Sequence, residues 1–209
     1  MPMTKLDLKH EFKALYTASL EPRLVQVPEL AFLMIDGVGD PNTGSEFPAA
    51  VGALYAFAYP LKFAVKRLPD GIDYGVMPLE GLWWAPSPAA FTEDDRSAWE
   101  WTAMIMQPDV VTEALFDAVL ARTGAKSPSE AISRVRLERL AEGSAAQVMH
   151  IGPYAAEAPT IARLHAFIAE QGLELAGKHH EIYLGDPRRT APEKLKTIIR
   201  QPVGPARRA

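Results

Sequence analysis

The spacing of apolar and polar residues divides the chain into short strands and a few helices. Apolar positions that recur every three or four residues predict helices at about 4–17, 45–66, 112–123 and 157–171. Alternation with a period of two predicts strands at about 23–27, 31–37, 72–84, 97–107, 134–140, 145–151, 179–185 and 195–201. Pro28 is expected to separate the first two strands, and Gly124 to end the third helix.

This order of elements occurs twice. Each half reads strand–strand–helix–strand–strand, and the segment 102–108 resembles the segment 197–202. We therefore expect one domain over residues 1–209, made of two repeats at about 23–108 and 134–203. The helix at 112–123 links them, and a disordered tail follows at 204–209. The predicted class is α+β, with tandem pseudo-symmetric modules forming antiparallel sheet and helices on one face. The seam between such modules is a natural place for a ligand cleft.

Composition narrows the function. Apolar residues make up 48% and charged residues 23%, as in ordinary soluble proteins, and the net charge of −4 disfavours a direct nucleic-acid partner. The absence of cysteine excludes disulfides, a cysteine nucleophile and thiolate metal sites. The first ten residues lack an apolar signal-peptide core, and no run approaches the roughly 20 apolar residues of a membrane helix. A cytoplasmic protein without a membrane partner, cofactor or metal is expected.

The segment 178–184 carries the densest group of chemical side chains. If it is a strand, His179, Glu181 and Tyr183 share one face, and the opposite face holds His180 with Ile182. The row is either a polar surface or a carboxylate and a phenol that line a cavity, and alternation alone favours the surface. Adjacent strand histidines face opposite ways, which disfavours a metal pair.

Two further strands combine tryptophans with carboxylates. Glu80 precedes one pair of tryptophans, and Glu100 lies between the other two. The four tryptophans are Trp83, Trp84, Trp99 and Trp101. A large aromatic core explains part of this group, but interleaved carboxylates also suit a wall that holds flat or cationic molecules. Burial among indoles would raise the pKa of a carboxyl group there, so that it could act as an acid or a base.

Three other residues are weaker candidates. His150 could be a general base, although a single strand histidine more often satisfies local hydrogen bonds, and Tyr154 follows it across the turn at Gly152. Asp36 lies beside Gly37, where turn formation is the more common role of an aspartate.

Four stretches of the sequence resemble the stand-alone GyrI-like small-molecule-binding proteins, which share the effector-binding fold of multidrug-sensing regulators. The similarity extends from about residue 5 to Val203. The matching stretches are Met34–Asn42, Pro78–Trp84, Met149–Tyr154 and His179–Arg189.

The resemblance implies tandem modules with a ligand cleft. Glu181 matches a glutamate on the pocket floor of the regulators that meets cationic drugs, and Tyr183 lies beside it, so the resemblance moves this row from the surface to the cleft. Some stand-alone members hydrolyse strained cyclopropane rings of DNA-alkylating natural products, and the stretch Glu80–Trp84 fits that subset. No helix-turn-helix module is present, so direct transcriptional control is not expected.

Two functions follow from these expectations. The first is a detoxifying hydrolase, in which Glu80 or Glu181 is the base and Tyr183 or Tyr154 steadies developing oxyanion charge. The second is a non-catalytic protein that sequesters flat aromatic or cationic drugs, with Glu181 as the counter-charge. A pseudo-dimeric chain has less need to dimerise, so a monomer is favoured. A role in modulating gyrase has little support in the sequence.

Overall fold

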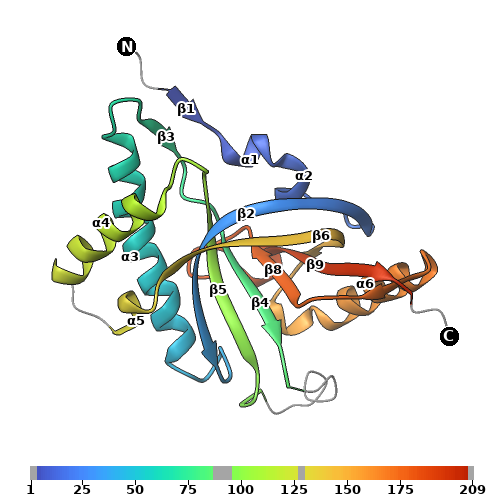
Figure 1. Ribbon diagram of the computed structural model, residues 1–209. Coiled ribbons are helices and arrows are strands. Elements are labelled where there is room, and N and C mark those ends of the chain that lie inside the picture. Colours follow the sequence, from blue (N-terminus) through green and yellow to red (C-terminus); the bar gives the residue numbers. More distant parts are fainter. Residues whose placement is uncertain (1–3, 87–95, 127–129, 207–209) are drawn as a thin grey trace. The chain divides into compact units, whose positions relative to one another are not determined.

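The computed structural model describes residues 4–86, 96–126 and 130–206, which form two compact units. Unit 1 comprises Met1–Glu11, Leu30–Leu79 and Trp83–Leu140, and unit 2 comprises Phe12–Glu29, Glu80–Leu82 and Ala141–Ala209. Figure 1 labels the helices and strands along the chain. In chain order they are β1 (Thr4–Leu6), α1 (Leu8–Glu11), α2 (Lys13–Tyr16), β2 (Arg23–Val38), α3 (Glu46–Lys66), β3 (Ile72–Tyr74), β4 (Leu79–Trp84), β5 (Glu100–Gln107), α4 (Glu113–Lys126), α5 (Glu130–Ser133), β6 (Arg136–Ile151), η2 (Tyr154–Ala156), α6 (Ala158–Glu170), β7 (Leu173–Leu175), β8 (His179–Tyr183), η3 (Pro192–Lys194) and β9 (Lys196–Pro205).

Unit 1 is built on antiparallel strands and on helix α3. β2 pairs with β5 in a register that sets Gly37 directly opposite Trp101. The indole of Trp101 lies where a β-carbon on residue 37 would be, so only glycine fits at that position. α4 and α5 pack against α3, as Figure 1 shows. β1 pairs with β3 in parallel, outside the main strands.

Helix α3 is the core helix of unit 1. Within the described residues it is the one helix whose length and composition would let it cross a membrane. Leu54, Phe57 and Leu61 on α3 are fully buried in the protein core, and the core helix of a soluble protein commonly has this composition.

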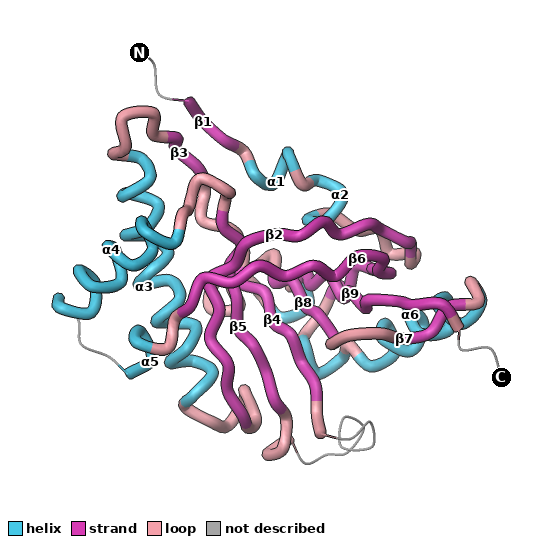
Figure 2. Tube along the Cα trace, viewed as in Figure 1, coloured by secondary structure: helices cyan, strands magenta, loops and turns pink. Residues whose placement is uncertain are grey.

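Unit 2 places β9 between β6 and β8, with antiparallel pairing on both sides. Figure 2 shows these strands in magenta and helix α6 in cyan. One face of the strands is covered by α6, because Leu164 and Ile168 pack with Val148 of β6 and Ile199 of β9 in one apolar cluster. Short strand β7 continues the pairing along the end of β9.

Several predicted boundaries were wrong for local reasons. β2 runs through Pro28, which is exposed and precedes Ala31, where the pairing of β2 with β5 begins. β6 is continuous across the gap between the two strands predicted at 134–140 and 145–151, and Gly143, with a φ of 69°, bends the strand without ending it. Gly124 lies inside α4.

The chain ends also differ from expectation. The predicted helix at 4–17 is a strand followed by two single-turn helices. The predicted disordered tail at 204–209 begins too early, because Gly204 and Pro205 belong to β9 and pair with β7. Residues 207–209 lie outside the described residues.

The α+β class with antiparallel modules is confirmed. The compact units do not coincide with the sequential repeats proposed at 23–108 and 134–203, because the segment 12–29 belongs to unit 2 and the segment 130–140 to unit 1. Strands β2, β4 and β6 each contribute residues to both units.

Candidate functional site

The polar row on β8 is a connected, largely buried group. His179 Nε2 lies 3.1 Å from Glu181 Oε1, and the Tyr183 hydroxyl donates to Glu181 Oε2 over 2.8 Å. The side chain of Glu181 is 14% exposed, so this carboxylate is held mainly by protein donors. Burial alone would raise its pKa, but hydrogen bonds from His179 and Tyr183 hold the pKa below the ordinary value. Glu181 is therefore an ionised carboxylate at neutral pH.

A second carboxyl group, from the start of α6, joins this row. Glu157 interacts with Glu181, and burial and then the charge of Glu181 raise the pKa of Glu157 to about 9. Two carboxyl groups in one buried position cannot readily both ionise, so Glu157 holds a proton at neutral pH. The result is an acid and a base in contact.

Aromatic and hydroxyl groups complete the surroundings. The rings of Tyr154 and Tyr183 meet edge to face, with centroids 5.4 Å apart. Thr197 of β9 is the register partner of Tyr183 on β8 and of His150 on β6, so the three residues form a row across the strands. Thr197 lies close enough to Glu157 to interact with it.

The opposite face of β8 carries a different network, which is almost completely buried. His180 Nε2 lies 2.9 Å from Glu80 Oε2, and His180 Nδ1 lies 2.9 Å from Glu142 Oε1. The Tyr16 hydroxyl donates to Glu80 Oε1 over 2.6 Å, and Arg200 Nη1 donates to Glu142 Oε2 over 3.1 Å. Both oxygens of Glu80 are thus occupied by protein donors, as both oxygens of Glu181 are by His179 and Tyr183. The two carboxylates differ in that Glu181 also lies beside the protonated Glu157.

The two predicted glutamates consequently differ in their surroundings. Glu80 is 1% exposed and bridges α2 to β8, which is the arrangement of a structural carboxylate. Glu181 lies beside two phenol rings and the carboxyl group of Glu157, and its pKa is shifted from the ordinary value, as is common for carboxylates at functional sites.

The four tryptophans belong to unit 1; two are buried in its core and two are partly exposed. Trp101 is 1% exposed and packs edge-on against the ring of Phe47. Trp83 is also buried and contacts both Phe47 and Trp99. Trp84 is partly exposed, and its indole Nε1 donates to Glu100 over 2.9 Å. Trp101 and Trp83 are therefore core residues, and Trp84 and Trp99 are the two that ligands could reach more easily.

His150 and Asp36 make local interactions. The ring nitrogens of His150 lie 3.1 Å from the Thr160 hydroxyl and 3.3 Å from the Pro153 carbonyl, so the ring secures the turn before α6. Asp36 accepts from the Thr102 hydroxyl over 2.6 Å and pairs with Arg136 at 2.9 Å. These contacts agree with the structural interpretation of both residues.

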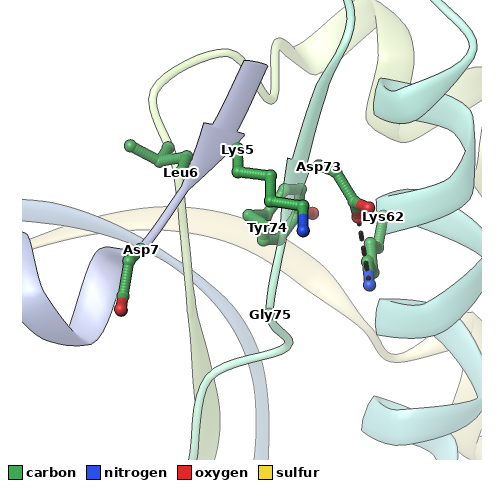
Figure 3. A pocket seen from close by; sticks show the side chains of 7 residues that line it. All are labelled: Lys5, Leu6, Asp7, Lys62, Asp73, Tyr74 and Gly75. Atoms are coloured by element: carbon green, nitrogen blue, oxygen red, sulfur yellow. Dashed lines mark ion pairs between the residues drawn. The ribbon is translucent and has the colours of Figure 1, made fainter. Parts of the chain in front are cut away.

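A surface hollow of about 420 Å³ lies elsewhere in unit 1, between β1, β3 and α3. Figure 3 shows its lining, including the ion pair between Lys62 and Asp73. None of the predicted site residues lines this hollow. Among the described residues no group of three or more His, Asp or Glu side chains is arranged to hold a metal ion.

Sequence reasoning missed Glu157 and Thr197. Glu157 precedes Ala158 and Pro159, a position at which acidic residues ordinarily face solvent at a helix N-terminus. Thr197 falls in a strand whose alternation gives it no special place. The pairing of β8 with β9 sets Thr197 opposite Tyr183, and the packing of α6 against β6 and β9 brings Glu157 to Glu181 and Thr197.

An α+β fold with a buried carboxylate beside aromatic rings is compatible with a small-molecule-binding protein. The chain belongs to the GyrI-like small molecule binding domain family, whose model matches residues 20–203.

Solved structures agree with this assignment. A Listeria innocua protein described as an uncharacterized conserved protein is 44% identical, with 95% of this chain and 100% of that chain covered and a TM-score of 0.89. A Listeria innocua hydrolase is 43% identical, with 96% and 100% covered and a TM-score of 0.86. The EcmrR C-terminal domain shares the fold alone, at 12% identity and a TM-score of 0.56, with 89% and 98% covered. No curated protein matches the sequence.

Proposed function

We propose that this protein binds flat aromatic or cationic small molecules and hydrolyses electrophilic ones, with Glu181 as the general base. The observation that carries the proposal is the state of Glu181: a carboxylate that is mostly buried, ionised, and bonded to His179 and Tyr183. A buried base that keeps its charge at neutral pH can accept a proton from an attacking water molecule.

The similar proteins support hydrolysis over mere binding. Two Listeria innocua proteins that are 42% and 43% identical over nearly the whole chain are described as hydrolases. The sequence resemblance described above suggests strained cyclopropane rings as the electrophile. Tyr183, which already donates to Glu181, and Tyr154, which contacts Tyr183, are the phenols nearest to such a reaction.

The proposed activity also suggests where the protein acts and in which assembly state. A protein that destroys DNA-alkylating compounds acts where their target is, so we assign it to the cytoplasm as a monomer that acts on small molecules without touching nucleic acid. Detoxification is the role that this activity would serve.

A non-catalytic binder is the second candidate. An ionised carboxylate beside the rings of Tyr154 and Tyr183 also suits a bound organic cation, because ring faces and carboxylates both attract positive charge. In that case Glu181 supplies binding energy and no proton transfer.

Glu181→Gln separates the two candidates. The purified protein is incubated in H₂¹⁸O with a cyclopropane-bearing DNA alkylator, and the product is followed by mass spectrometry. Wild type is expected to add one labelled water per molecule with turnover, and the variant to lose about 10²–10⁴-fold in rate, the usual contribution of a general base. Glu170→Gln, at the exposed end of α6, is the matched control and should behave as wild type.

Tryptophan fluorescence in the same samples reports binding. Quenching without labelled product, together with weaker binding of a cationic aromatic dye to Glu181→Gln, would establish the binder instead. Unchanged turnover in Glu181→Gln would remove Glu181 from the chemistry altogether.

A further inference from the structure

Two donors from the same strand hold the carboxylate of Glu181, one on each oxygen. His179 precedes Glu181 by two residues and Tyr183 follows it by two, so the three side chains share one face of β8. His179 Nε2 lies 3.1 Å from Oε1, and the Tyr183 hydroxyl donates to Oε2 over 2.8 Å. Because an ionised carboxylate only accepts hydrogen bonds, Nε2 is the ring nitrogen that carries the hydrogen.

The two donors differ in how easily a bound molecule could reach them. The side chain of His179 is 7% exposed, so its hydrogen bond to Glu181 is enclosed by protein. Tyr183 is only partly buried, and its ring lies edge to face against that of Tyr154, which is also partly buried. A ligand beside these rings therefore meets the Tyr183 hydroxyl more readily than the His179 ring.

We propose that His179 is a positioning residue: its Nε2–H holds Oε1 of Glu181 throughout the reaction, so that the Tyr183 hydroxyl can leave Oε2 and donate to the substrate. This inference rests on the proposed function and adds to it a division of labour between the two donors. A phenol has a single hydrogen to donate, so Tyr183 cannot hold Glu181 and steady an oxyanion at the same time. If His179 were absent, the release of Tyr183 would leave Glu181 without a donor from β8.

The step balances with water as the only co-reactant. When Tyr183 turns to a substrate oxygen, Glu181 loses one of the donors that lower its pKa and becomes a stronger base. Glu181 takes a proton from water while the water oxygen bonds to the electrophilic carbon. The bond that breaks at that carbon leaves its electron pair on the substrate oxygen to which Tyr183 donates. That oxygen then takes a proton from solvent, and Glu181 releases its own.

The electrostatics around Glu181 agree with this assignment. Burial alone would raise the pKa of Glu181, and the hydrogen bond from His179 counteracts this more than the hydrogen bond from Tyr183 does. Burial and then the charge of His179 lower the pKa of His165, so His165 adds no charge at neutral pH. The titratable groups around Glu181 and His179 are Tyr183 on β8, Tyr154 on η2, Glu157 at the start of α6 and His165 on α6.

Two substitutions at residue 179 test the role of the donor. His179→Met removes it with an unbranched apolar side chain that suits a buried position, whereas His179→Gln keeps an N–H group on a side chain of similar length. The matched control is His10→Met, at an exposed histidine of α1, which should behave as wild type.

Kinetics in the hydrolysis assay described above give the first readout. The low-pH limb of kcat/KM should move up by about one to two pH units in His179→Met, the usual effect of losing a hydrogen bond to a charged group. Its kcat at neutral pH should fall about 10–100-fold with KM within about threefold, because the base is no longer held in place. His179→Gln should keep kcat within about threefold of wild type, because the donor is restored.

A titration that needs no turnover gives the second readout. The side-chain carboxyl groups of ¹³C-labelled glutamate are followed by NMR as the pH is lowered, and the Glu181 signal is the one missing from Glu181→Gln. Its midpoint should be higher in His179→Met than in wild type by about one to two pH units. Loosened packing alone would reduce kcat and leave this midpoint where it was.

The outcomes separate this inference from the proposed function. An unmoved Glu181 midpoint and an unmoved low-pH limb in folded His179→Met overturn the positioning role, and the hydrolase stands as long as wild type turns over. Equal losses of kcat in His179→Met and His179→Gln, without a pH shift, also overturn it. If wild type shows no turnover but the midpoint shifts, hydrolysis is refuted, and His179 holds Glu181 for the cation of the second candidate.

Discussion

Replacing His180 with glutamine should remove a pH-dependent part of the stability of unit 2. His180 is fully buried between two carboxylates, Glu80 and Glu142, and donates to each over 2.9 Å. Arg200 also donates a hydrogen bond to Glu142, and the Tyr16 hydroxyl also donates one to Glu80. Although burial alone would lower the pKa of His180, the two carboxylates raise it to about 9. Glutamine supplies a neutral donor without the positive charge.

The magnitude follows from the pKa of the folded and unfolded states. A rise from 6.5 to about 9 corresponds to about 3 kcal/mol of stabilisation at about 1.4 kcal/mol per pH unit. Because the folded pKa is the higher one, this stabilisation is complete below about pH 6.5 and is lost as pH rises to about 9. Glu142 shows the acid side of the same ion pair: the charges of His180 and Arg200 lower its pKa to about 2 in spite of burial, so its contribution fades as pH falls from 4.5 toward 2. The two figures describe one interaction and are not added.

Chemical denaturation of wild type and His180→Gln at pH 6 and at pH 9.5 tests this reasoning. The difference in unfolding free energy between the two proteins should be about 3 kcal/mol at pH 6 and less than about 1 kcal/mol at pH 9.5. Taking the difference cancels groups that titrate in both proteins, Glu157 among them. A difference that stays constant over this range would mean that His180 is neutral in the folded protein, and the charged network would be refuted.

Two further predictions concern stability. Gly37→Ala should cost about 1–3 kcal/mol, because the new methyl group collides with the Trp101 indole, whereas Gly52→Ala, in an exposed position of α3 with open space around it, should stabilise by about 0.5–1 kcal/mol. Thermal melts of both variants decide this, and equal effects would contradict the packing of the indole. Glu80→Gln should cost about 1–3 kcal/mol, since it weakens the bonds from its tyrosine and histidine partners, but should keep turnover within about threefold of wild type. A large fall in turnover of correctly folded Glu80→Gln would restore this residue as the base.

The apolar spacing predicted the three longest helices well, but not the one expected at 4–17. Helix α3 begins and ends within one residue of its predicted bounds, because a long apolar stripe leaves little freedom in the choice of ends. The strands were harder. Pro28 and Gly143 are ordinary break signals, yet β2 and β6 continue through them, since pairing with neighbouring strands outweighs local preference.

Of the candidate site, the sequence predicted only the residues that lie on the single strand β8. Alternation along β8 gave the row of His179, Glu181 and Tyr183, because residues two apart in a strand share a face whatever surrounds them. It could not show that Glu157 would lie against Glu181, since that contact depends on how α6 packs over β6 and β9. It also could not distinguish Glu80 from Glu181, because their partners Tyr16 and Glu157 lie far away in sequence.

The two faces of β8 separate stability from reactivity. On one face His180 lies between the carboxylates of Glu80 and Glu142, and the charges of His180 and Arg200 lower the pKa of Glu142, so that Glu142 is a poor base. On the other face Glu181 is next to a carboxyl group of the same kind, and repulsion is relieved only by keeping a proton on Glu157. A proton held by repulsion is available for transfer, whereas one held between opposite charges is not. Because a residue shift of one would exchange the two faces, the ion network around His180 also fixes the register that directs Glu181 toward Glu157.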